Sequence, residues 1–218
     1  IAADIAQADA LVSLNHLKGH EMAGYGGALK NIGMGCGSKA GKYAMHDRVR
    51  PGIDLKKCIG CGYCATWCSG HALRAENGKI VFDDPQCIGC GECILSCPRD
   101  VFHIPWDENT GGVQEKIVEY AYGVLKGKRH FSINVINFIT QYCDCYPTKG
   151  KPLVRDIGIM ASADPVALDA ASADMVNKVY GGDFWRSIFP AIDWQVQLSY
   201  AEQLGLGQRE YTLVEFAG

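Results

Sequence analysis

The chain has 218 residues and a net charge of −3, and 48% of its residues are hydrophobic. This is the composition of a globular protein with one large or two small domains. The small negative charge argues against nucleic acid or an anionic membrane as the main partner, and no apolar run approaches the roughly 20 residues of a membrane span. No signal peptide is apparent. We expect a cytoplasmic protein whose sequence, which begins at Ile1, lacks an upstream part.

The first predicted element is a strand, ADALVSL (8–14), which leads into a glycine-rich segment. In that segment the pair Gly26-Gly27 permits positive φ and a close approach to a ligand. Lys30 can bind a phosphate or a carboxylate, and the glycines between 33 and 37 offer backbone N–H groups to an anion. The segment matches neither a dinucleotide fingerprint nor a Walker loop, so it is weak as a nucleotide-binding motif.

The strongest signal is a repeat of the motif C-x2-C-x2-C-x3-C, which runs from Cys58 to Cys68 and again from Cys87 to Cys97. Three cysteines on a tight loop can face three corners of an iron–sulfur cubane, and the fourth, on the following helix, reaches the neighbouring cluster. Two zinc sites are the alternative, but zinc does not require four cysteines in this spacing twice. Reduced thiolates that hold metal favour a reducing cytoplasm, as in an anaerobe.

Residues 52–105, around this repeat, resemble a bacterial two-cluster ferredoxin. The resemblance implies two 4Fe–4S clusters, one held by Cys58, Cys61, Cys64 and Cys97, and the other by Cys87, Cys90, Cys93 and Cys68. The first run departs from the usual pattern, because Ser69 rather than a proline follows Cys68. The flanking runs KIVF (79–82) and VFHI (101–104) read as short strands that pair with each other.

Beyond the repeat, apolar residues three and four apart predict a helix over 113–127. Strands are expected at 129–140 and 156–162, where β-branched residues are frequent. A helix over 164–180 has Asp164 as its N-cap and Pro165 at its first position. Asp156, Asp164 and Asp169 could be site carboxylates at strand and helix ends, but a capping Asp164 and a solvated Asp169 inside the helix are favoured. A helix over 191–207, with Gly205 near its end, and a strand over 211–216 close the chain.

Strands that alternate with helices predict an α/β domain with a mostly parallel sheet flanked by helices. Turn signals at 50–52 and 105–107 interrupt it. We therefore expect a discontinuous α/β domain of residues 1–50 and 106–218, with an inserted α+β ferredoxin-like domain at residues 51–105.

Three cysteines lie outside the repeat. Cys143 and Cys145 share a short loop after a predicted strand, and Cys36 lies in the glycine-rich segment. Together with His46, His20 or His16 they could bind zinc, nickel or a further iron–sulfur cluster. The alternative is that Cys36 is a small buried residue and the other two are unpaired thiols.

The segments NHLKGHEMAGYGGALKNIGMG (15–35), CDCYP (143–147) and DIGIMASADPVALDAASADMV (156–176) resemble the domain-of-unknown-function 362 family, uncharacterised Fe–S-centre proteins with a ferredoxin insert. The first segment is also similar to the cofactor segment of nickel-pincer lactate racemases. That family has a lysine ten residues after a histidine and a second histidine sixteen further on, as His20, Lys30 and His46 are spaced here. The resemblance implies an acid/base role for His20, a cofactor or anion anchor at Lys30, and a metal ligand at His46.

These patterns lead to an iron–sulfur electron-transfer protein whose two clusters exchange electrons with a second site in the α/β domain. The alternative is a redox or racemase-like enzyme that acts on a small anionic substrate with a metal or nickel-pincer-type cofactor at His20, Lys30 and His46. A scaffold with purely structural clusters is a third possibility, less favoured because ordinary cores serve that purpose. The redox partner protein and the oligomeric state are not specified by the sequence.

Overall fold

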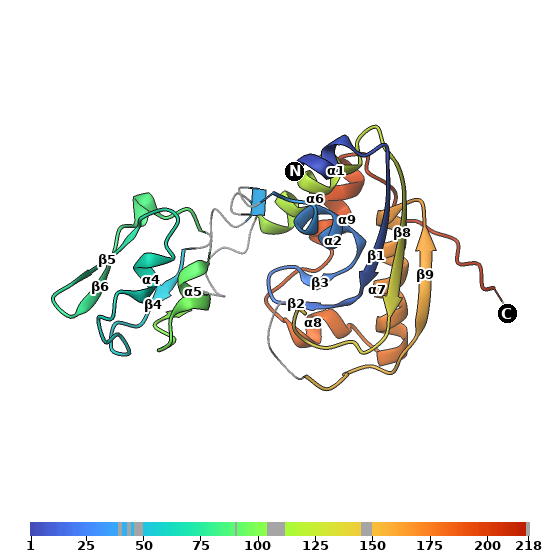
Figure 1. The fold of residues 1–218 in the computed structure, drawn as a ribbon. Coiled ribbons are helices and arrows are strands. Elements are labelled where there is room, and N and C mark those ends of the chain that lie inside the picture. Colours follow the sequence, from blue (N-terminus) through green and yellow to red (C-terminus); the bar gives the residue numbers. More distant parts are fainter. Residues whose placement is uncertain are drawn as a thin grey trace. The chain divides into compact units, whose positions relative to one another are not determined.

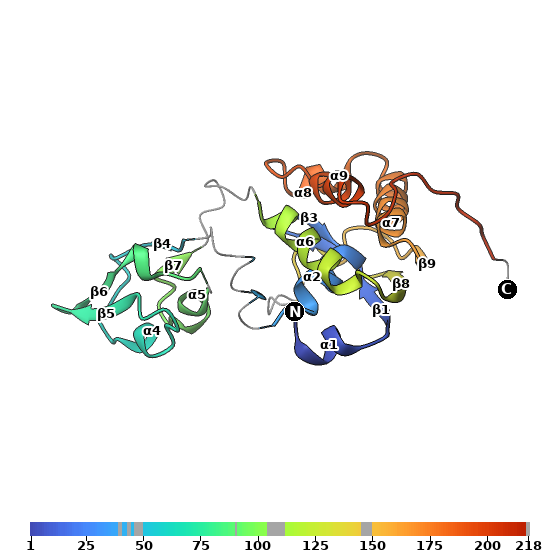
Figure 2. The same cartoon turned by 90° about the horizontal axis from the view of Figure 1, so that it is seen from above.

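The computed structural model describes residues 1–38, 41–42, 45, 50–89, 91–103, 112–144 and 150–216. The chain forms two compact units, one of Ile1–Ser38 and Val113–Gly218 and the other of Lys39–Gly112. Figures 1 and 2 together label the described helices and strands of both units. None of the described helices is long and apolar enough to cross a membrane.

The larger unit is an α/β structure built on a three-stranded sheet in the order β1-β8-β9. Strands β1 (Ala10–His16) and β8 (Arg129–Ile136) are parallel, whereas β9 (Gly158–Ser162) is antiparallel to β8. A mostly parallel sheet is therefore not confirmed among the described residues, because one of the two strand pairs is antiparallel. A separate hairpin joins β2 (Lys18–His20) to β3 (Gly24–Gly26).

Helices pack on this sheet and on one another (Figures 1 and 2). They are α1 (Ala3–Gln7), α2 (Ala28–Gly35), α6 (Val113–Leu125), α7 (Pro165–Tyr180), α8 (Phe184–Ile188) and α9 (Val196–Gln203). Helices α2 and α6 approach closely at Gly33, where a Cβ atom would overlap the carbonyl oxygen of Ile117. Aromatic rings complete the core, with Tyr25 5.2 Å from Trp185 and 5.9 Å from Trp194 between ring centroids.

The predicted start of α7 is confirmed. Oδ1 of Asp164 accepts hydrogen bonds from the N–H groups of Val166 (2.8 Å) and Ala167 (3.0 Å), and Pro165 is the first helical residue. The closing helix is shorter than predicted and ends at Gln203, just before Gly205 with φ = 72°. The predicted last strand is wrong, because residues 211–216 are extended but pair with no described strand.

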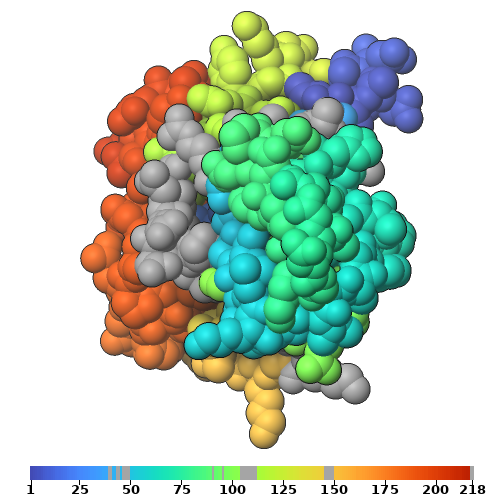
Figure 3. All heavy atoms as spheres, turned by 90° about the vertical axis from the view of Figure 1, so that its left-hand side faces the viewer, coloured from blue at the N-terminus to red at the C-terminus, as the bar shows by residue number. Residues whose placement is uncertain are grey.

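The described part of the smaller unit contains two short sheets and several short helical segments, and Figure 3 shows one of its faces in cyan to green. Strand β5 (Leu73–Glu76) pairs with β6 (Lys79–Phe82), and β4 (Gly52–Ile53) pairs with β7 (Phe102–His103). The two predicted strands thus exist, but they do not pair with each other. The other elements are α4 (Tyr63–Thr66), α5 (Glu92–Ser96) and the 3₁₀ turn Asp84–Gln86.

Candidate functional site

The two cysteine motifs fold in the same way. Each has two glycines with left-handed backbone: φ is 68° at Gly60 and 67° at Gly89, and 71° at both Gly62 and Gly91. Glycine is the residue that adopts this conformation without strain. The second glycine of each pair precedes a short helix, α4 or α5, that carries the motif's third cysteine, and the fourth cysteine follows the helix end. The sequence repeat is therefore also a repeat of backbone conformation.

Backbone N–H groups point at the sulfur atoms of these motifs. The N–H of Gly60 lies 3.4 Å from Sγ of Cys58, and the N–H of Gly89 lies 3.4 Å from Sγ of Cys87. The N–H of Ala72 lies 3.2 Å from Sγ of Cys68. Such donors stabilise negative charge on sulfur and help to set the reduction potential of an iron–sulfur cluster.

A small cavity in this unit is lined by four thiols, Cys58, Cys61 and Cys64 from the first motif and Cys97 from the second. Ile80, Val101 and Phe102 complete its apolar walls. Burial, and then the neighbouring Cys97 and Cys61, raise the pKa of the Cys64 thiol. Thiolates crowded in a poorly solvated space repel one another, and a bound metal cation would relieve that repulsion.

The donors of this cavity are thiols, which both zinc and iron–sulfur clusters bind. In a tetrahedral zinc site the four sulfurs lie about 3.8 Å apart, as follows from Zn–S distances near 2.3 Å. In a cubane each cysteine binds a different iron, so the thiols surround the guest. Among the described residues no group of three or more His, Cys, Asp or Glu converges on one metal position, whereas the four thiols line one cavity.

The other predicted ligand set is described in part. Cys93 is buried, Cys68 and Cys87 are half-buried, and Cys93 and Cys68 belong to the unit's apolar core. Cys90 lies outside the described residues.

In the larger unit the structure brings together Lys30 and Cys143, which are far apart in sequence. Nζ of Lys30, on α2, lies 3.4 Å from Sγ of Cys143, in the loop that follows β8. Next to Cys143, Asp144 forms an ion pair with the almost fully buried Lys18, and its Oδ2 lies 3.3 Å from Nδ1 of His16. Two lysines, one thiol and one carboxylate therefore form a polar cluster, here called the lysine–cysteine site.

The charge of Asp144 depends on its two basic neighbours. Partial burial alone would raise the pKa of this carboxyl, but Lys18, and to a smaller extent His16, hold it below its ordinary value of 3.8. The ammonium of Lys18 in turn needs the carboxylate, since an unpaired charge at 5% exposure is costly. The Asp144 carboxylate therefore neutralises one of the two lysines of the site and leaves Lys30 to face the thiol.

Of the remaining residues predicted for this site, two are described by the structure and two are not. His20 is buried on β2, and its Nδ1 accepts a hydrogen bond of 3.3 Å from the N–H of Met22. This leaves Nε2 as the nitrogen that carries the proton in the neutral ring. Cys36 is half-buried and packs against the core of the larger unit. His46 and Cys145 lie outside the described residues.

The space beside the two glycines before Lys30 is filled by side chains of the same chain. A Cβ atom on Gly26 would lie 3.2 Å from Cδ of Lys30, and one on Gly27 would overlap the carboxylate of Asp169. That carboxylate accepts hydrogen bonds from the N–H groups of Ala28 (2.7 Å) and Leu29 (2.9 Å). The space predicted for a ligand at Gly27 therefore holds the side chain that caps α2.

Asp169 itself was expected to be solvated, and this is wrong: it is fully buried. Burial raises its pKa from 3.8 to about 6, because hydrogen bonds from Asn134, Leu29 and Ala28 offset only part of the desolvation. The predicted anion-binding role of the glycines between 33 and 37 also fails for Gly33 and Gly35, whose N–H groups belong to α2.

A buried polar network that the sequence did not suggest connects this cap to the sheet. Nδ2 of Asn134 donates to Asp169 (2.8 Å), and Oδ1 of Asn134 accepts from Asn15 (3.0 Å). Asn31, on α2, donates to Oδ1 of Asn15 (2.6 Å). The ring of hydrogen bonds holds α2, and so Lys30, on the sheet. Its only sequence signal is the alternation Ser13/Asn15 and Ser132/Asn134, polar positions inside apolar strands.

A comparison with protein-family models matches residues 1–174 to DUF362, described as a domain of unknown function. The match includes both cysteine motifs and the lysine–cysteine site. No curated protein matches the chain.

Proposed function

The chain belongs to the DUF362 family, and we propose that it is an iron–sulfur protein that transfers electrons. In this proposal the smaller unit holds two 4Fe–4S clusters, which exchange electrons with the lysine–cysteine site or with a protein partner. Each cluster would supply one-electron chemistry at a potential set by its surroundings.

One observation carries this proposal. Cys97 lines the same cavity as Cys58, Cys61 and Cys64, although it belongs to the other motif. In two-cluster ferredoxins the fourth cysteine of each such motif binds the cluster of the other motif, and the position of Cys97 agrees with that crossing. The proposal assigns that cavity to one cluster and the second ligand set to the other.

The residues around the thiols would control such a cluster. Ile80, Val101 and Phe102 form apolar walls that limit water at the cavity. The N–H groups of Gly60 and Gly89 donate toward ligand sulfurs and would stabilise the more negative, reduced state. The chain thus supplies both the ligands and the surroundings that tune a potential.

The test is iron analysis of protein purified without oxygen. We expect about eight irons per chain, from two four-iron clusters. Cys97→Ser should remove about four of them, because it deletes one ligand of one cluster. Cys36→Ser is the matched control, since that thiol packs against the other unit's core, and it should keep the wild-type iron content. Zinc in place of iron, or unchanged iron in Cys97→Ser, would overturn the proposal.

The lysine–cysteine site favours a second candidate function, an enzyme that acts on a small anionic substrate. Its support is the position of Lys30 beside Cys143, and the buried Lys18 close by. Lys30 would bind a carboxylate or anchor a nickel-pincer-type cofactor, and His20 would exchange the proton. His46, proposed as a metal ligand, completes this set.

Thermal unfolding with lactate and with inorganic phosphate as probes tests this candidate. Either anion should stabilise the wild-type chain but not Lys30→Met. Lys178→Met, on the exposed side of α7, is the control and should respond as the wild type does. Nickel near one equivalent per chain would support the metal version. If neither anion changes the unfolding temperature of the wild type, the anionic-substrate function is excluded for these probes.

A further inference from the structure

The C-terminal end of the chain projects from the larger unit as an extended arm, residues 212–216. Its sequence, TLVEF, has the β-branched and aromatic residues of a strand. Within the described residues, no backbone hydrogen bond ties it to the rest of the chain. Its apolar side chains are unusually exposed, 66% for Val214 and 92% for Phe216. A strand sequence is thus present without a sheet.

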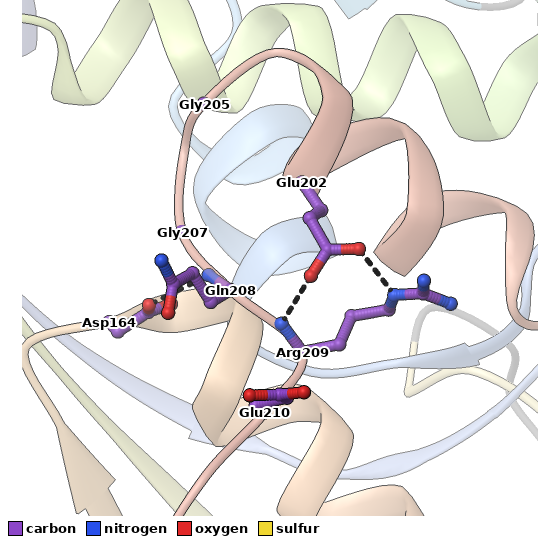
Figure 4. A pocket seen from close by; sticks show the side chains of 7 residues that line it. All are labelled: Asp164, Glu202, Gly205, Gly207, Gln208, Arg209 and Glu210. Atoms are coloured by element: carbon purple, nitrogen blue, oxygen red, sulfur yellow. Dashed lines mark hydrogen bonds and ion pairs between the residues drawn. The ribbon is translucent and has the colours of Figure 1, made fainter.

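The base of this arm is firmly anchored. Oδ2 of Asp164 accepts from the N–H of Gln208 (2.9 Å), and Glu202 accepts from both the N–H and Nε of Arg209. These residues line a surface pocket, in which Asp164 and Glu202 bond to the chain that leads into the arm (Figure 4). The hydroxyl of Tyr211 donates to Asp174 on α7 (2.9 Å). The anchors end at Tyr211, so the direction in which the arm leaves the unit is defined.

The sheet of the same unit has an open edge. Strand β9 is the last in the order β1-β8-β9, so one side of its backbone has no strand partner in the described chain. Its outward-facing Ile159 is 69% exposed, and it continues an apolar sheet face formed by Val12, Leu14, Phe131, Ile133, Val135 and Ala161. Exposed apolar edges of this kind invite a further strand.

We propose that the arm of one copy pairs with the β9 edge of a second copy, and that the second copy returns its own arm in the same way. The arm and the open edge lie on the same side of the unit in both ribbon views (Figures 1 and 2). Two copies related by a twofold axis can therefore exchange arms at a single self-complementary contact.

The alternation of side chains along a strand determines which arm residues lie on the same face of the exchanged pair. Successive residues of a strand point to opposite sides, so Thr212, Val214 and Phe216 share one face. Paired with β9, this face lies beside Ile159 and extends the apolar surface over the two most exposed arm residues. An arm with these side chains buries on the order of 400 Å². Two arms with their two receiving surfaces then bury about 1,600 Å², the size of a stable interface.

Sedimentation velocity of the full chain, purified without oxygen, tests the exchange. The wild type should dimerise at concentrations up to about 100 μM, within the range of interfaces of this size. The double variant Val214→Asp/Phe216→Asp and the edge variant Ile159→Lys should each raise the dissociation constant at least about tenfold, since each places a charge in the new strand pair. Leu14→Lys alters the same apolar face at the opposite edge of the sheet and should leave the dimer intact.

A mixture of the arm variant and the edge variant distinguishes arm exchange from other contacts between two copies. The arm variant keeps a normal edge and the edge variant keeps a normal arm, so an equimolar mixture should regain association through one arm. Circular dichroism checks that the exposed substitutions leave the fold unchanged. The proposal is overturned if the wild type stays monomeric at the highest concentration or if the arm variant remains dimeric. Loss of the dimer in Leu14→Lys alone would assign the contact to stacking of sheet faces and would equally overturn it.

Discussion

Gly27 and Asp169 are in direct contact, although 141 positions in the chain separate Asp169 from the neighbouring Ala28. The carboxylate occupies the place that a side chain at position 27 would need, and it caps the N-terminus of the helix that carries Lys30. The glycine is therefore required by the protein's own packing. A helix N-terminus is a favourable place for a carboxylate, and this contact fixes where α2 begins on the sheet.

This contact predicts that Gly27→Ala destabilises the larger unit. The new methyl group would overlap Asp169, so either the cap or the helix must move. Lost caps and strained packing typically cost 1–3 kcal/mol, and we expect about 2 kcal/mol in urea unfolding. Gly182→Ala is the control, because a Cβ atom there meets nothing closer than 3.9 Å. Equal effects of the two substitutions would contradict the contact.

The buried carboxyl also predicts a pH dependence of stability. The pKa of Asp169 is raised from 3.8 to about 6 in the folded chain, so the folded state binds the proton more tightly than the unfolded one. Stability from this group is present at low pH and is lost as pH rises toward and through 6. Linkage gives a loss of about 1 kcal/mol between pH 5 and pH 8.

Asp169→Asn tests this assignment, because the amide has the same shape but does not titrate. The difference in unfolding free energy between wild type and variant, measured by urea titration from pH 5 to pH 8, should change by that amount in favour of the variant. A difference that stays constant across this range would show that the group does not titrate there. Taking the difference removes the contribution of all other titrating groups, provided the variant keeps the fold.

The close approach of α2 and α6 gives a second prediction about glycine. A Cβ atom at Gly33 would overlap the backbone carbonyl of Ile117, which cannot rotate away. We expect Gly33→Ala to lower the unfolding free energy by about 2–3 kcal/mol, the cost of an overpacked core. Gly35→Ala, two residues along the same helix, meets only Asn31 at 3.4 Å. It should be neutral or stabilising by up to about 1 kcal/mol, since alanine favours helix.

Local signals were sufficient for several elements. Asp164 followed by Pro165 predicts a helix start, because a capping carboxylate and a proline act within one turn, and α7 begins there. The apolar run that predicts a strand over 8–14 indicates β1 in the same way, although β1 begins and ends two residues later, at Ala10–His16. Such elements need no knowledge of distant residues. The family was also apparent from the segments around Lys30 and Asp164, and the match over residues 1–174 establishes it.

Contacts between distant segments were not predictable. Asp169 looks like a solvated helical residue because its partners Ala28, Leu29 and Asn134 belong to other elements, at least 35 positions away. Lys18 gave no signal, and its partner Asp144 lies 126 positions further on. The strand expected at 211–216 has the right composition, but it pairs with no strand among the described residues. Strand sequences form strands only where an edge receives them.

The ion pair of Lys18 and Asp144 predicts that substitutions of its two members lower the stability by different amounts. Asp144→Asn leaves the buried ammonium of Lys18 without its counter-ion, and we expect a loss of about 1–3 kcal/mol, typical for a hydrogen bond to a charged group. Lys18→Met removes the charge and keeps an apolar stem, so its loss should be smaller. The double variant Lys18→Met/Asp144→Asn should be no less stable than Asp144→Asn alone. Additive losses in the double-mutant cycle would mean that the two groups do not interact.

The repeated glycines of the two cysteine motifs give the last prediction, on cluster assembly. Gly60 has φ = 68°, and a Cβ atom there would overlap the backbone of Gly78. Alanine at position 60 must therefore displace the loop whose N–H points at Cys58, and anaerobically purified Gly60→Ala should lose iron from that cluster. Gly78→Ala shares the left-handed backbone, with φ = 75°, but meets no atom within 4 Å. It therefore has a similar backbone strain, of order 1–2 kcal/mol, without the overlap.

Iron content and absorbance near the thiolate-to-iron charge-transfer bands should be reduced in Gly60→Ala and close to wild type in Gly78→Ala. Equal losses would mean that backbone strain in the hairpin, and not the packing of the cysteine loop, limits assembly.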